Sequence, residues 1–117
     1  MNTTQNYELI ITIVNRGFAD YVVEATRNAG ASGGTIVHGR GTGDYENDSI
    51  LGVSIQPEKE MVLTLTTKED KQRIMNAIVE HSGLTQEGKG ICFSLPVLDV
   101  AGINHLMKSE NNKKKKK

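Results

Sequence analysis

The hydrophobic pattern of the chain falls into two similar stretches, of which the first covers residues 7–37. Tyr7–Val14 is β-branched and apolar at almost every position, which predicts a central strand of a sheet. From Phe18 to Ala29, apolar residues recur at helical spacing, and Gly30 follows where a helix commonly turns into the left-handed conformation. Thr35–Val37 is the next short strand. This stretch therefore predicts a strand, a helix and a second strand.

The second stretch repeats that order. Glu60–Thr66 alternates between the two faces of a predicted strand. Thr67 begins a helix as its N-cap, with an acid three residues later, and Gly83 ends this helix. Ile91–Val97 is the last predicted strand. Two such units in one chain predict a ferredoxin-like βαββαβ sandwich, an α+β fold with one antiparallel sheet and two helices on one face.

The face of this sheet away from the helices is predicted to remain partly apolar. Ile10, Val14 and Val62 are the residues expected on it. An apolar sheet face needs a cover, and association of identical chains supplies one. The pattern therefore predicts an oligomer.

Between the two stretches the pattern disappears from Gly39 to Ser54. Seven of the twelve glycines lie between Gly30 and Gly52. A segment of this composition buries little apolar area, so we expect a long structureless loop with an acidic tip at Asp44–Asp48. Such loops are commonly functional, which makes this one the first place to look for binding.

Two glycine-rich turns carry a cation each. Gly39–Gly43 contains Arg40, and Lys89 stands between Gly88 and Gly90. Glycine allows backbone N–H groups to converge on an anion, and an adjacent cation adds a charge-assisted contact. Together the turns suit the polyphosphate of a nucleotide. An ordinary turn between helix and strand is the alternative for the second one, since neither turn is a Walker motif.

Composition and charge restrict the class of protein. The 117 residues suit one domain, and five of the fourteen Lys and Arg residues are Lys113–Lys117, which leaves nine bases against fourteen acids and a net charge of −5 in the rest. An acidic body argues against nucleic acid as a partner. Residues 108–117 are expected to form a disordered lysine-rich tail. Without an apolar leader or membrane span, the predicted location is the cytoplasm.

Side chains for catalysis are scarce. Cys92 lies within a predicted strand and is expected to be a small core residue. His38, His81 and His105 are far apart and lack the spacing of a metal site. We therefore predict neither a catalytic residue nor a metal site, and a slow nucleotide hydrolase is retained only as an alternative.

The order and spacing of the loops over about Tyr7–Val100 resemble the PII nitrogen-regulator family, specifically its divergent PII-like members. Gly34–Val37 followed by Gly39–Gly43 is similar to one family stretch, and Pro57 precedes the third strand as it does there. Gly88–Val97 is similar to the family's last glycine loop and strand. The resemblance implies a homotrimer with nucleotide clefts between subunits and ATP, ADP or AMP as the effector.

The resemblance also implies roles for single residues. Thr35 and Thr64 would lie by the adenine, and the two glycine turns would hold the phosphates. The implied nucleotide-binding set is Thr35, Arg40, Gly41, Thr42, Gly43, Thr64, Gly88, Lys89 and Gly90.

A flexible T-loop at about residues 40–55 would engage a target protein, such as a membrane transporter or an enzyme. Its partner-binding residues would be Asp44, Tyr45, Glu46, Asn47, Asp48 and Ser49. The implied domain is residues 1–107, with a B-loop at about 84–90. The predicted function is that of a non-enzymatic signalling protein in nitrogen regulation.

Departures from the family pattern keep a second function open. Ile91 stands where the family has a phosphate-binding lysine, and Leu98–Ile103 has no arginine where the family has two. The alternative is a trimeric interaction module that has lost nucleotide binding. An RNA-recognition module shares the fold, but Glu60–Thr66 holds none of the aromatic residues that such modules stack on bases.

Overall fold

The computed structural model describes residues 6–42, 48–50, 53–55, 57–86 and 89–102. Its elements, in chain order, are β1 (Tyr7–Asn15), α1 (Ala19–Asn28), β2 (Thr35–Arg40), β3 (Asp48–Ile50), β4 (Val53–Ile55), β5 (Glu58–Thr67), α2 (Lys68–Ser82) and β6 (Gly90–Val97). No helix in these ranges is long and apolar enough to cross a bilayer. The predictions for Gly43, Asp44–Asn47, Gly88 and the tail 108–117 fall outside the described residues.

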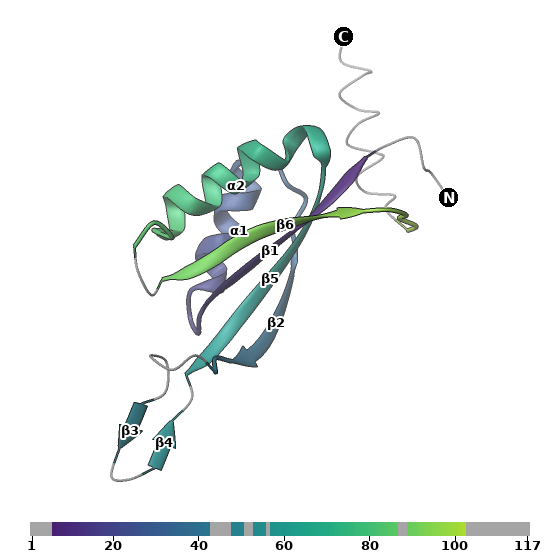
Figure 1. Cartoon of the computed structure of the whole chain (residues 1–117). Coiled ribbons are helices and arrows are strands. Elements are labelled where there is room, and N and C mark those ends of the chain that lie inside the picture. The colour runs from purple at the N-terminus through teal and green to yellow at the C-terminus, as the bar shows by residue number, and fades with distance from the viewer. Residues whose placement is uncertain (1–5, 43–47, 51–52, 56, 87–88, 103–117) are drawn as a thin grey trace.

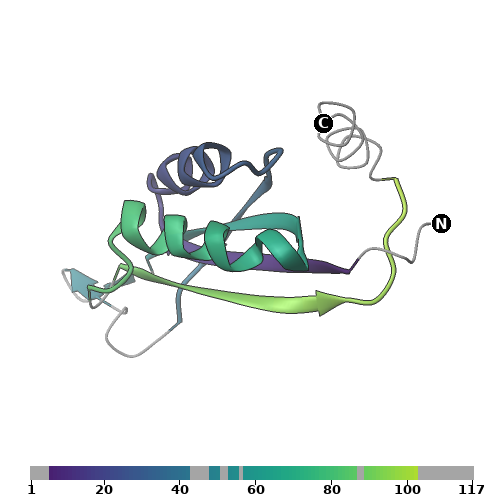
Figure 2. The same cartoon turned by 90° about the horizontal axis from the view of Figure 1, so that it is seen from above.

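Four strands form one antiparallel sheet in the order β2-β5-β1-β6. Both helices lie on the same face of this sheet (Figures 1 and 2), and they pack against each other there. The predicted ferredoxin-like α+β sandwich is therefore confirmed, with every predicted strand and helix of the two βαβ units present.

The core lies between the sheet and the helices. Ile10, Val14 and Val62 are fully buried and belong to one cluster with residues of both helices, namely Val22, Ala25, Ile74 and Ile78. The prediction that these three strand residues occupy the uncovered face is thus wrong. β1 is apolar on both faces, so its pattern does not distinguish them, and the hand of the βαβ connections decides which face the helices cover.

The uncovered face carries the other set of apolar residues. The strand register brings Ile11 between Leu63 and Phe93, and Ile13 between Met61 and Ile91, on this face. Ile91 remains 57% exposed, and Phe93 and Leu95 are also exposed. The prediction that one face of the sheet stays apolar holds in substance, although different residues form it.

Local sequence signals set the limits of α2. Thr67 Oγ1 accepts a hydrogen bond from the backbone N–H of Asp70 at 3.2 Å, as the capping sequence predicted. At the other end Gly83 adopts φ 65°, the left-handed conformation in which glycine is favoured. α2 is therefore defined at both ends by residues close to it in sequence.

The segment predicted to be structureless from Gly39 to Ser54 contains regular structure. β2 continues through Gly39 to Arg40 because its backbone pairs with β5 as far as Glu58, and backbone pairing needs no apolar side chain. Further on, β3 and β4 pair as a hairpin, which Figure 1 shows beyond the end of the sheet. The prediction of a wholly irregular loop is therefore wrong in these places.

Candidate functional site

The candidate site lies at the end of the sheet where β2 ends and β6 begins. Across this end, Arg40 of β2 is paired with Glu58 of β5, and Val14 of β1 with Gly90 of β6. Arg16 follows directly after β1, and its backbone N–H donates to the carbonyl oxygen of Glu58 at 3.1 Å. The fold thus brings both cation-bearing turns to the same end of the molecule.

The two turns nevertheless lie on the two outer strands of the sheet. β2 and β6 are separated by β5 and β1, so three strand spacings put about 14 Å between their backbones. The two turns therefore do not adjoin each other within one chain. Turns from two copies of the chain have no such restriction.

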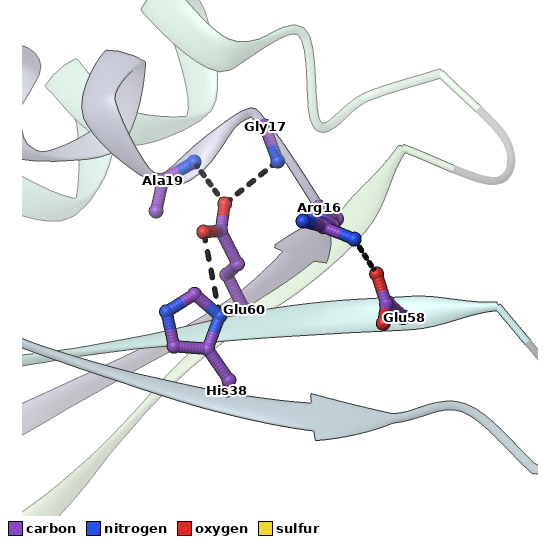
Figure 3. A network of polar contacts seen from close by, with 6 residues as sticks. All are labelled: Arg16, Gly17, Ala19, His38, Glu58 and Glu60. Atoms are coloured by element: carbon purple, nitrogen blue, oxygen red, sulfur yellow. Dashed lines mark hydrogen bonds and ion pairs between the residues drawn. The ribbon is translucent and has the colours of Figure 1, made fainter.

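Glu60 organises the helix side of this end, as Figure 3 shows. Its Oε1 accepts hydrogen bonds from the backbone N–H groups of Gly17 at 2.8 Å and Ala19 at 3.1 Å. The N-cap residue Phe18 supplies no side-chain cap to α1, so a carboxylate from β5 takes that role. Burial raises the pKa of Glu60, but the Ala19 and Gly17 N–H donors, with His38 and Arg16, outweigh it and lower this pKa overall.

His38, on β2, lies beside Glu60 of β5. The register pairs the two residues, and His38 Nδ1 is 3.7 Å from Glu60 Oε2. His38 is itself exposed. When protonated, its imidazolium adds a charge contact to a carboxylate that already caps α1.

Glu58 forms an ion pair with Arg16 on the same side of the sheet (Figure 3). The side chains of Arg16 and Glu58 are 69% and 57% exposed, whereas that of Glu60 is only 12% exposed. Two carboxylates on one strand, two residues apart, therefore differ in environment. Glu60 is built into the fold, and Glu58 lies at the surface.

Lys89 is exposed at the other turn and lies over an aromatic ring. Its Nζ is 6.0 Å from the ring centroid of Phe18. The Phe18 and Tyr21 rings lie 5.9 Å apart, and that of Tyr21 lies 6.3 Å from His81. Lys89 is thus held near the start of α1, with its charge accessible to a ligand.

Two glycines of these turns already make contacts within the chain. A Cβ atom on Gly90 would lie 2.3 Å from the carbonyl oxygen of Ile13, and the φ of Gly90 is 141°. The Gly41 N–H already donates to the carbonyl oxygen of Pro57 at 2.8 Å. Close packing therefore accounts for Gly90 without a ligand, and the Gly41 N–H is already engaged within the chain. Thr42 is exposed at the end of the described part of this turn.

The structure places the two predicted adenine contacts on different faces. Thr35 is exposed at the start of β2 opposite Leu63, whereas Thr64 is fully buried on the helix side. Gly34 lies against Thr64, because a Cβ atom added to Gly34 would be 3.5 Å from Thr64 Oγ1. Their shared role at an adenine stays a prediction.

A groove of about 640 Å³ lies next to Thr35, along α1. It is lined by Asp20, Val23, Glu24, Arg27, Asn28, Gly34 and Ile36. None of these residues belongs to the predicted nucleotide-binding set. The groove flanks the position of Thr35 in the chain, between Gly34 and Ile36, and its lining carries charges of both signs.

Among the described residues, few side chains are placed for nucleophilic chemistry or metal binding. Cys92 is half-buried against the core, as predicted, and its Sγ accepts a hydrogen bond from Thr12 Oγ1 at 3.5 Å. Burial raises the pKa of the Cys92 thiol and favours its protonated form, although the Thr12 contact acts in the opposite direction. Over the same ranges no three His, Cys, Asp or Glu side chains gather as metal ligands.

Comparison with known proteins agrees with this fold. Among solved structures, the chain is similar to Arabidopsis thaliana PII bound to citrate, with a TM-score of 0.62 and 22% identity over 86% of this chain and 82% of that one. This likeness supports the fold. A search of curated proteins found no match. The family model described as nitrogen regulatory protein P-II matches residues 7–105, and the chain therefore belongs to the P-II family.

Proposed function

We propose that this chain is a non-enzymatic P-II signalling protein of the cytoplasm. In this proposal it assembles as a homotrimer and binds a small anionic effector, with an adenine nucleotide such as ATP, ADP or AMP as the first candidate. The observation that carries the proposal is the position of two cation-bearing turns at one end of the sheet, on opposite outer strands.

Assembly follows from the uncovered sheet face. Apolar residues from three neighbouring strands, Ile13, Met61 and Ile91, lie side by side on it. Exposed apolar patches of this kind mark interfaces. In a closed ring of identical chains, every chain makes the same contacts with its neighbours. Such a ring would cover the open sheet face of each chain and bring the outer strands of neighbouring chains together.

Ligand binding between copies follows from the distance across the sheet. Arg40 of one copy and Lys89 of the next would converge where their outer strands meet. Two cations provide charge-assisted hydrogen bonds to an anion. Citrate, the ligand in the Arabidopsis PII structure, is itself a small anion, which supports the charge class of the effector.

Signalling to a partner protein would use the segment at residues 40–55. The β3–β4 hairpin lies within it and extends beyond the sheet (Figure 1). The base of this segment begins at Arg40, so an effector held there has direct contact with the strand that carries the hairpin. Effector binding then changes the affinity for a membrane transporter or an enzyme by favouring one arrangement of this segment.

The test is calorimetric titration of the assembled protein with ATP, ADP, AMP and citrate, with sedimentation velocity to determine the number of chains. We expect saturable heat with at least one nucleotide and a species of three chains. Absence of binding to every nucleotide at millimolar concentration would refute the nucleotide proposal, and a stable monomer would refute the shared site.

A second candidate is a trimeric interaction module without nucleotide binding. It is favoured because Gly90 packs closely against β1 and the Gly41 N–H is already bonded within the chain. The two candidates differ in the role of Lys89. Replacing it, Lys89→Ala, should abolish the ligand response in the effector proposal and leave partner binding intact in the interaction module.

A further inference from the structure

Glu58 lies between two arginines on neighbouring strands. Arg40 is its direct partner across the β2–β5 pair, and residues paired in this way have side chains on the same face. On the other side, Arg16 contacts Glu58 twice, through the side-chain ion pair and through its backbone N–H. The two arginine backbones are about 10 Å apart, two strand spacings, with Glu58 between them.

Exposure makes the Glu58 contact exchangeable. An ion pair between two exposed side chains contributes little because water screens it, and its loss changes an equilibrium by about fivefold or less. Glu60 differs, since its carboxylate is mostly buried and accepts two backbone N–H groups. An incoming anion can therefore displace Glu58 from Arg16 without disturbing the cap of α1.

Arg40 lies on the same face of the sheet as Glu58, opposite it on β2. Among the described residues it has no ion-pair partner, although it stands next to Glu58 in the sheet. The Gly41 N–H is already bonded to Pro57, and Arg40 supplies the positive charge at this turn. Guanidinium groups suit that purpose, since their planar donors match phosphate oxygens in pairs.

We infer that Arg16 and Arg40 form an anion-binding pair for a polyphosphate, and that the Glu58 carboxylate competes with the ligand for Arg16. In the empty protein the three side chains sum to one positive charge. When Glu58 swings away, two guanidinium groups face the ligand. The inference rests on the proposed function for the identity of the ligand as a nucleotide, but the anion site itself is defined by these three residues.

The experiment measures affinity for two probes, ATP and inorganic tripolyphosphate, by calorimetry on the assembled protein. Arg16→Gln should weaken tripolyphosphate binding about tenfold, the effect of one charge-assisted hydrogen bond. Glu58→Gln should strengthen it about three- to fivefold, because the competitor is removed. The double variant should behave as Arg16→Gln alone. Lys68→Gln and Glu69→Gln, exposed positions at the far end of the molecule, make the same changes in net charge and should leave both affinities unchanged.

The outcomes separate this inference from the proposed function. If ATP binds but Glu58→Gln and Arg16→Gln behave like the two control variants, the inference is wrong and the nucleotide proposal stands. If tripolyphosphate binding responds as expected and ATP does not bind to any variant, the inference stands and the nucleotide proposal is wrong. If neither probe binds to any variant, both are wrong. Thermal melts of each variant verify that the fold is retained.

Discussion

The two faces of the sheet differ in what covers them more than in how apolar they are. The covered face includes buried polar residues, among them Thr12 and Thr64, alongside Ile10 and Val62. The open face presents Ile11, Leu63 and Phe93 in one row across three strands. Hydrophobic content alone would assign the helices to the open face. The comparison shows that chain connectivity decides which face forms the core and which face the helices leave uncovered.

The most severe test of this comparison is a charge on the covered face. Val62→Asp buries a carboxylate among apolar side chains, and we expect loss of about 4 kcal/mol or more of stability, enough to unfold a marginal domain. Far-UV circular dichroism and urea denaturation measure the effect. A folded variant of near-native stability would contradict the assignment of Val62 to the core.

A charge on the open face should separate folding from assembly. Phe93→Asp is expected to leave the secondary structure intact and to shift the protein to monomers, because the carboxylate must be desolvated at the contact between copies. Sedimentation velocity measures the shift. Leu98→Asp is the matched control, since Leu98 is 91% exposed and lies beyond the end of β6. Equal dissociation in both variants would argue against this face as the interface.

Gly90, on the outer strand β6, tests how closely this strand must approach β1. Gly90→Ala introduces a Cβ into contact with the backbone oxygen of Ile13 at a strained φ, and we expect a loss of about 1–3 kcal/mol. Gly39→Ala is the control, as its Cβ would meet nothing within 4 Å. Chemical denaturation compares the two. Similar stabilities would mean that β6 adjusts freely.

The smallest expected effect concerns the edge of the covered face, where Glu60 caps α1. Its lowered pKa means that the ionised form stabilises the folded state above the ordinary glutamate pKa of 4.5, and that this contribution is lost as the pH falls through the lower folded pKa. Glu60→Gln should cost about 1 kcal/mol at neutral pH and flatten the acid limb of the stability profile. Thermal melts between about pH 3 and 7 measure this. An unchanged acid limb would mean that the Glu60 charge contributes nothing.

Local patterns were sufficient to predict the strands and helices of the two βαβ units, although not the β3–β4 pair. Contacts between distant residues account for the missed end of β2. Thr67 and Gly83 limit α2 by interactions within a few residues, so the sequence reveals them. The continuation of β2 to Arg40 depends on pairing with β5, which no local pattern encodes.

The candidate site was predicted only in part, for the same reason. Arg40 and Lys89 stood out because glycines surround them in the sequence. Arg16, Glu58 and Glu60 carry no local motif, and they come together only through the strand register. Arg16 could have been placed beside Glu58 only by pairing the predicted strands side by side in the correct register.

The capping of α1 by Glu60 has a consequence for the order of folding. The bonds from Gly17 and Ala19 to Glu60 span 43 and 41 residues, whereas α2 is capped by its immediate neighbour. During synthesis, α1 therefore lacks its N-terminal cap until β5 has left the ribosome, while α2 can nucleate as soon as its own residues emerge. The start of α1 is thus completed only by a residue from the second half of the chain, whereas the start of α2 is completed within its own segment.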